Sequence, residues 1–277
     1  MVEYLAKWFL RRDIRVAIVS RGYGAAEGER NDESRELSEK LPSVPHIQNT
    51  DRVAAAKLAE EELGIQLVLL DDGFQHRRLE RDLDLVLIDA LNPFGFDRIF
   101  PRGLLREPVE GLQRAQLIAL TRADLVSEQD RSQIRQRVRE IAPAAKWAEV
   151  AHAATSLVGG AKKLSESERS LKQLASRRVV AFCGLGNPAG FVHTLATTGA
   201  DVLDFREFPD HHDYARSDID AICDWISEVG PDMVICTHKD LVKFNVDQLA
   251  GVPLRALIVE LSVLNGEEEF SGPESSS

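Results

Sequence analysis

Short apolar runs alternate with polar or helical segments along this chain, and this alternation constrains its fold more than any other feature. The runs, rich in Val, Ile and Leu, cover Val16–Ser20, Leu67–Leu70, Asp84–Asp89, Ala115–Thr121, Arg178–Gly184, Met233–Thr237 and Leu254–Val259. Segments with helical spacing or helix-forming composition cover Met1–Leu10, Asp32–Leu41, Asp51–Leu63 and Glu128–Ile141. Buried strands separated by helices favour a parallel sheet with helices on its faces, so the sequence predicts an α/β fold.

The chain divides into two predicted domains and a tail. Residues 1–155 hold the first run of strands and helices and form the predicted core domain. The polar, Gly-containing stretch Gly159–Glu168 is typical of a linker or an exposed turn. A new strand–turn–helix pattern follows it, so residues 156–264 are predicted to form a smaller C-terminal α/β domain. Residues 265–277 are acidic and Ser-rich, and we predict a disordered tail.

Composition excludes several classes of function. The net charge of −11 argues against a nucleic-acid-binding surface, which needs a basic stripe. Three cysteines without CxxC spacing indicate free thiols and no zinc site. No apolar run is long enough to span a bilayer, and no signal-peptide pattern is present. These features predict a cytoplasmic protein.

Two adjacent carboxylates, Asp71 and Asp72, follow the apolar run Leu67–Leu70. Ligands of open α/β sheets bind at the carboxyl ends of the strands, and carboxylate oxygens there suit Mg²⁺. On the pair alone, an acidic surface turn is the simpler interpretation.

The start of the chain is unusual for this fold. Met1–Leu10 has helical spacing but no N-cap residue before it, and a strand and the Gly-rich turn Arg21–Gly24 follow directly. This order predicts an α/β unit whose first strand is missing.

Four motifs occur in a fixed order: Arg21–Gly24, Asp71–His76, Gly103–Pro108 and Phe208–His212. Together they resemble the tetraacyldisaccharide 4′-kinases, P-loop kinases that phosphorylate the lipid A precursor. The resemblance implies a P-loop NTPase-like parallel sheet flanked by helices. It also implies a Gly-Gly-Thr-Gly-Lys-Thr-Pro phosphate loop, whose helix would correspond to Met1–Phe9. This chain therefore resembles a kinase that begins after its phosphate loop, and we expect it to be weakly active or inactive alone.

The resemblance also implies roles for single residues, with ATP and Mg²⁺ as cofactors. The catalytic base is Asp32, paired with His211; Asp71, Asp72 and Glu107 hold the metal; Arg21, Tyr23, Asp71 and Asp72 bind the nucleotide; Arg52, Gln75, His76, Arg102 and Arg106 contact the substrate. Without the resemblance, Asp32 is simply a carboxylate at a helix start, and Asp51 beside Arg52 is a helix cap. Thr237–Asp240 resembles a family turn that we interpret as structural.

The loop at 92–108 mixes three Phe with three Arg, which is unusual in so acidic a chain. A lipid with acyl chains and a phosphate would need apolar surface and guanidinium groups together. The alternative is a packed loop with its own aromatic cluster.

The predicted function is ATP-dependent phosphorylation of the 4′-hydroxyl of tetraacyldisaccharide 1-phosphate, on the inner face of the bacterial inner membrane. Its expected partners are the lipid A precursor and the membrane surface. Two alternatives stay open: a non-catalytic remnant that binds lipid or a partner, and a metal-dependent hydrolase using Asp71, Asp72 and Asp210–His212.

Overall fold

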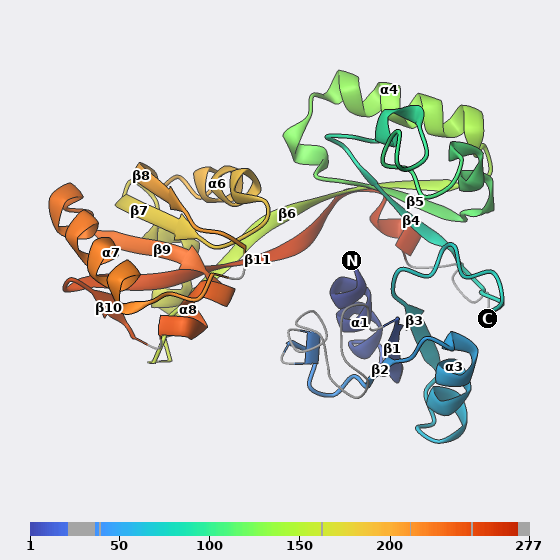
Figure 1. Ribbon diagram of the computed structural model, residues 1–277, viewed down its shortest axis with the longest axis horizontal. Coiled ribbons are helices and arrows are strands. Elements are labelled where there is room, and N and C mark those ends of the chain that lie inside the picture. The colour runs from blue at the N-terminus through green and yellow to red at the C-terminus, as the bar shows by residue number, and fades with distance from the viewer. Residues whose placement is uncertain (22–36, 39, 162, 211, 245, 271–277) are drawn as a thin grey trace. The chain divides into compact units, whose positions relative to one another are not determined.

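The computed structural model describes residues 1–21, 37–38, 40–161, 163–210, 212–244 and 246–270 (Figure 1). The chain forms two compact units, one with Met1–Ala151 and the segment from Val263 onward, the other with His152–Ser262. Two long strands, β6 (Lys146–Val158) and β11 (Val252–Asn265), contribute residues to both units. Within the described part of the chain, no helix has the length and apolar character needed to cross a membrane.

The first unit contains a three-stranded parallel sheet of order β2-β1-β3. The elements of this unit are α1 (Val2–Leu10), β1 (Val16–Ser20), β2 (His46–Gln48), α3 (Arg52–Glu61), β3 (Leu67–Leu70), β4 (Leu85–Asp89), η1 (Gly95–Asp97), η2 (Val109–Arg114), β5 (Leu117–Thr121), η3 (Ala123–Leu125), α4 (Glu128–Ile141), the start of β6 and η5 (Glu267–Phe270). Helix α1 packs on the sheet, and Ala6 of the helix lies in one buried cluster with Val16 and Ile18 of β1. The helical spacing of the apolar residues of α1 gives the helix one apolar face, and this face packs against β1, the strand that follows it.

A second parallel set in the first unit consists of β4, β5 and the start of β6. Ile118 and Leu120 of β5 are fully buried and lie in one cluster with Ile134 and Val138 of α4. Their spacing of two along the strand and four along the helix places each pair on one face. Helix α4 therefore covers this part of the sheet (Figure 1).

The second unit is a mainly parallel sheet with helices on both faces, and its short strand β10 pairs antiparallel with β11. Its elements, besides the ends of β6 and β11, are α5 (Glu166–Arg169), η4 (Leu171–Gln173), β7 (Arg178–Cys183), α6 (Pro188–Ala196), β8 (Asp201–Glu207), α7 (Arg216–Val229), β9 (Met233–Thr237), α8 (His238–Phe244) and β10 (Gln248–Leu249). The strand order is β11-β9-β7-β8, with β10 paired to β11. Phe182 of β7 packs with Trp225 of α7, whereas its neighbour Ala181 packs with Phe191 of α6. Since successive side chains of a strand point to opposite faces, both faces of β7 are buried, as its continuous apolar run predicts.

The α/β fold class predicted from the alternation of apolar and helical segments is confirmed by this structure. Strands β1, β3 and β9 begin and end at the predicted residues. Strands β6 and β8 and helix α7 were not predicted, and the predicted helix at 32–41 lies mostly outside the described residues. The predicted tail is also partly ordered, because Phe270 of η5 is 7% exposed and its ring packs edge-on against Tyr4.

A buried carboxylate organises one end of the β7–β9 sheet. Asp240 is 0% exposed and accepts hydrogen bonds from the Thr237 hydroxyl (2.6 Å), the Tyr214 hydroxyl (2.9 Å) and the Gly184 N–H (3.1 Å). Burial, together with the nearby Asp240 charge, raises the pKa of Tyr214, so its hydroxyl stays a donor. Such hydrogen bonds offset the cost of removing this carboxylate from water.

We predict that Asp240→Ala lowers the free energy of unfolding by about 3 kcal/mol, because it leaves several buried donors without an acceptor. Urea denaturation followed by circular dichroism measures this value. The matched control is Asp220→Ala on the exposed side of α7, which should change stability by less than about 0.5 kcal/mol. Equal effects of the two substitutions would contradict the structural role of Asp240.

Candidate active site

The carboxyl end of β3 places Asp71 and Asp72 at the edge of the parallel sheet. Asp71 continues the strand pairing, since its N–H donates to the Val19 carbonyl (2.8 Å). Asp72 has a left-handed backbone (φ 50°), which Asp tolerates better than most residues. The chain then turns sharply at Gly73, where a side chain would collide with Leu70. The two carboxylates therefore start a tight turn that leaves the strand.

The N-terminus of α1 lies beside this turn. Helix α1 precedes β1 directly and packs on it, so its N-terminal end lies at the edge of the parallel sheet where β1 and β3 end. The backbone N–H groups and the dipole at a helix N-terminus favour bound anions. A helix start and a pair of carboxylates thus meet at one sheet edge, which suits a phosphate with its metal ion.

Arginine side chains approach the turn from two directions. Arg52, the first residue of α3, is 7% exposed and donates from Nη2 to the Asp72 carbonyl (3.2 Å). Asp51 before it caps α3 by accepting from the N–H groups of Val53 and Ala54. The Arg106 guanidinium contacts both carboxylate oxygens of Asp72 (2.6 and 2.7 Å). The structure thus brings three predicted site residues, Arg52, Asp72 and Arg106, into contact.

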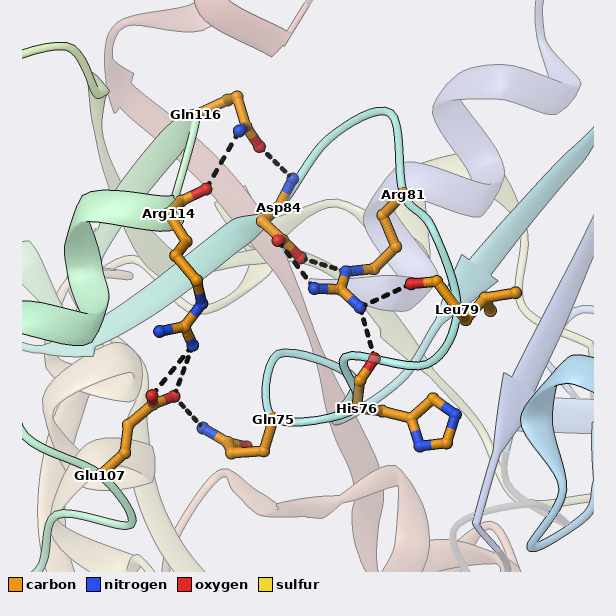
Figure 2. Close-up of polar contacts among 8 residues, drawn as sticks. All are labelled: Gln75, His76, Leu79, Arg81, Asp84, Glu107, Arg114 and Gln116. Atoms are coloured by element: carbon orange, nitrogen blue, oxygen red, sulfur yellow. Dashed lines mark hydrogen bonds and ion pairs between the residues drawn. The ribbon is translucent and has the colours of Figure 1, made fainter.

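Glu107 fixes the position of Gln75. Its carboxylate accepts from Gln75 Nε2 (3.0 Å) and from Arg114 Nη2 (2.8 and 2.9 Å) (Figure 2). The Arg114 guanidinium also lies over the ring of Phe74, 4.3 Å from its centroid. Glu107 is therefore an anchor of the turn at residues 73–76.

Arg81 stabilises the chain just after this turn. It donates to both carboxylate oxygens of Asp84 (2.6 and 3.0 Å) and to the carbonyls of His76 (2.5 Å) and Leu79 (2.9 Å) (Figure 2). Gln116 completes the chain of contacts by accepting from the Asp84 N–H and donating to the Arg114 carbonyl. The sequence did not predict the roles of Arg81 and Arg114. The three-residue spacing of Arg81 and Asp84 could have indicated their ion pair, whereas the spacing of Glu107 and Arg114 matches no regular pattern.

His76 and Arg52 each keep a buried nitrogen without a hydrogen-bond partner among the described residues, His76 Nε2 and Arg52 Nε. Such atoms are costly unless something pairs with them. Both residues belong to the predicted substrate site, and their unused nitrogens suit a bound polar ligand.

The other predicted site residues are placed less closely or not at all. Arg21 follows β1 directly at the same sheet edge and is exposed, and Arg102 is exposed in the loop before Arg106. Tyr23, Asp32 and His211 lie outside the described residues.

Among described side chains, no group of three or more His, Cys, Asp or Glu is arranged around a common point for a metal ion. His212 is instead hydrogen-bonded to Asp218 (2.9 Å) and stacked on Phe208.

A parallel α/β sheet with adjacent carboxylates at a strand end beside a helix N-terminus has a ligand site typical of open α/β folds, and the solved structure that it matches places it in the P-loop kinase class. A model of the tetraacyldisaccharide-1-P 4′-kinase family (LpxK) matches residues 1–271. The chain therefore belongs to the tetraacyldisaccharide 4′-kinase family, as its four motifs predicted.

Individual relatives agree with this assignment. The tetraacyldisaccharide 4′-kinase of Halothermothrix orenii is 36% identical, with 95% of this chain aligned to 76% of that protein. The one of Anaeromyxobacter dehalogenans strain 2CP-C is 38% identical, over 93% of this chain and 72% of that protein. The crystal structure of "apo" form LpxK from Aquifex aeolicus in complex with ATP has a TM-score of 0.64 at 27% identity. It covers 98% of this chain and 81% of the other.

The Glu107 anchor predicts a pH-dependent contribution to stability. The hydrogen bond from Arg114, and a further one from Gln75, hold the pKa of Glu107 below its usual value against the effect of burial. A carboxyl with a lowered folded-state pKa adds stability above its unfolded pKa, and this is lost as the pH falls through the folded value. We expect Glu107→Gln to lower the free energy of unfolding by up to about 1 kcal/mol at pH 7 and by less in acid.

Urea titrations at pH 7 and pH 4 measure both values. The exposed Glu110→Gln in η2 is the control and should have a small effect at either pH. A Glu107→Gln effect that stays constant between the two pH values would contradict the ionic anchor.

Proposed function

We propose that this chain is the phosphotransferase part of a lipid A 4′-kinase, which transfers the γ-phosphate of ATP to the 4′-hydroxyl of tetraacyldisaccharide 1-phosphate. Membership of the family supports the reaction, as does the related Aquifex aeolicus structure, which is a complex with ATP. The observation that carries the proposal in this chain is that Asp71 and Asp72, at the carboxyl end of β3, share one sheet edge with the start of α1.

The nucleotide phosphates belong at this sheet edge. Phosphoryl transfer needs little covalent chemistry from the protein, so positioning and electrostatic stabilisation of the phosphates dominate. The α1 N-terminus offers a positive dipole end, and Arg21 follows the neighbouring strand β1 at the same edge. Arg21 and Tyr23 are proposed nucleotide contacts, because a guanidinium can bind a phosphate with two hydrogen bonds.

Mg²⁺ fits the donor set of the turn. It commonly uses one or two protein carboxylates and completes its shell with waters and phosphate oxygens. Asp71 and Asp72 are the proposed ligands, with Glu107 as an outer contact, and the ion would neutralise charge on the β- and γ-phosphates. The Asp72–Arg106 pair is exposed on both sides (63% and 66%), so it is weak enough for a cation to replace Arg106.

The residues around the turn are the proposed contacts of the lipid headgroup. Arg106 and Arg102 would bind its phosphate, while Arg52, Gln75 and His76 would bind polar groups of the sugar. The support is the unused nitrogens of Arg52 and His76 and the fixed position of Gln75 on Glu107. Released from Asp72, Arg106 has a free guanidinium for the phosphate of the lipid.

Asp32 is the proposed general base, oriented by His211. A base of this kind must accept the proton of the attacking hydroxyl, and a His–Asp pair can hold the carboxylate in place. This part of the proposal rests on the match to the family motifs.

Carboxylate substitutions test the metal and nucleotide assignment. Asp71→Asn and Asp72→Asn should each lower kcat for ATP-dependent phosphorylation of tetraacyldisaccharide 1-phosphate by at least about 100-fold, because each weakens the binding of the Mg²⁺ that would neutralise the phosphates. The exposed Asp82→Asn is the control and should keep full activity.

The measurement uses radiolabelled ATP and two forms of the protein, the chain itself and the chain extended by a strand and a Gly-Gly-Thr-Gly-Lys-Thr-Pro loop. We expect strong activity from the extended form, and the Asp variants and their control are compared in that form. An extended form that folds but makes no product would overturn the kinase proposal in favour of a non-catalytic remnant.

Asp32→Ala in the extended form tests the base. General acid–base catalysis contributes about 10²- to 10⁴-fold, so kcat should fall within that range while the KM for ATP changes little. Glu60→Ala, exposed on α3, is the control. Full activity of Asp32→Ala would show that another group takes the proton.

A further inference from the structure

The loop between β4 and β5 exposes a cluster of large apolar side chains at residues 95–106, which we name the Phe–Arg loop. Phe96 is 71% exposed, Phe100 76% and Leu104 63%. Large aromatic side chains are rarely so exposed, and their grouping on one short loop marks an interaction surface.

The Phe–Arg loop is built to hold this conformation. The Gly95 carbonyl accepts from the Leu104 N–H (3.0 Å), and the Phe100 N–H donates to the Leu105 carbonyl (2.9 Å). A side chain on Gly103 would collide with the carbonyl oxygens of Gly95 and Arg98, so only glycine allows this close approach. Backbone hydrogen bonds thus join the two ends of the loop, and its large apolar side chains point to solvent.

The base of the loop is attached to α4. Asp97 forms an ion pair with Arg137, and the Arg137 guanidinium lies over the ring of Phe94, 4.1 Å from its centroid. Phe94 itself is buried in the cluster beneath α4. Phe94, the residue before the loop, therefore fills the core, whereas Phe96 and Phe100 within the loop do not.

The backbone at Phe96 is strained. Phe96 has φ 61° and lies between Gly95 (φ 52°) and Asp97 (φ 55°), so three successive residues are left-handed. This conformation disfavours bulky side chains, and glycine or asparagine would fit it better. A strained and exposed Phe contributes little to folding, so its place in the loop points to a contact outside the chain.

Basic side chains accompany the apolar ones. Arg98 and Arg102 are both exposed and alternate with Phe96, Phe100 and Leu104 along the loop. The whole chain carries a net charge of −11, so its general field does not attract an anionic surface. Attraction to such a surface must be local, and this loop combines positive charge with apolar side chains.

We propose that the Phe–Arg loop docks on a lipid bilayer with anionic headgroups, with Phe96, Phe100 and Leu104 in the interface and Arg98 and Arg102 on the headgroup phosphates. Phe and Leu beside basic residues are typical of segments that bind at the membrane interface, and each nearby Arg adds attraction to anionic lipid. The inference rests on the proposed function in one respect: the proposed substrate is a lipid, which the kinase would meet at a membrane. It assigns the contact to the loop between β4 and β5 of the first unit.

Vesicle binding tests this directly and needs no enzyme activity. The full chain is mixed with phosphatidylcholine vesicles that contain or lack phosphatidylglycerol, without any lipid A precursor, and bound protein is measured by flotation. We expect binding that depends on phosphatidylglycerol and weakens with salt. The triple variant Phe96→Asn, Phe100→Ser, Leu104→Ser should bind about 30-fold more weakly, and Arg98→Gln about fivefold more weakly.

The controls are exposed side chains of the same types elsewhere. Leu63→Ser with Val242→Ser matches the apolar substitutions, and Arg139→Gln matches the charge change. Near-native binding of the controls supports the loop assignment. Undiminished binding by the triple variant overturns it, as does a wild-type chain that fails to float. If the triple variant keeps vesicle binding and, when made in the extended form, loses activity on micellar substrate, the loop contacts acyl chains of that substrate and the bilayer proposal is wrong.

Discussion

The parallel pairing of β3 with β1 is the constraint on which the candidate site depends. It continues one residue beyond β3, since the Asp71 N–H bonds to the Val19 carbonyl, and it therefore fixes where the carboxylates leave the sheet. The left-handed Asp72 and the crowded Gly73 then turn the chain at once. Because the turn is set by backbone pairing and sterics, its carboxylates are in place before any ligand arrives.

The arginines around this turn divide into two groups by exposure. Arg81 and Arg114 are mostly buried and hydrogen-bonded to Asp84 and Glu107, so their loss would leave partly buried charges unpaired. Arg106 is mostly exposed, and its pair with Asp72 contributes at most about 1 kcal/mol. The first group is suited to hold the turn in shape, and Arg106 is suited to exchange partners.

The sequence predicted the strands whose runs are continuous and apolar, because parallel strands buried on both faces need little else. Strand β6 was not predicted, because its sequence from Lys146 mixes Ala with charged and polar residues. It forms a strand because it pairs with β5. The motif residues Asp72, Gln75, Arg106 and Glu107 were predicted, and the structure places them together. Their pairing could not be predicted, because contacts between residues 30 or more positions apart depend on the fold and leave no local pattern. The roles of Asp32 and His211 stay predictions, since both residues lie outside the described part of the chain.

The Phe–Arg loop and the Asp72 turn are connected by very little chain. Leu104 and Arg106 are two positions apart, so their Cα atoms lie within about 7 Å of each other. A loop docked on a bilayer would therefore hold Arg106 near the headgroup level, next to the carboxylate that it pairs with in this structure. A lipid phosphate in that plane could then replace Asp72 as the partner of Arg106 while its acyl chains stay in the membrane. Docking and substrate binding would then share one short segment, and neither requires the lipid to be fully extracted.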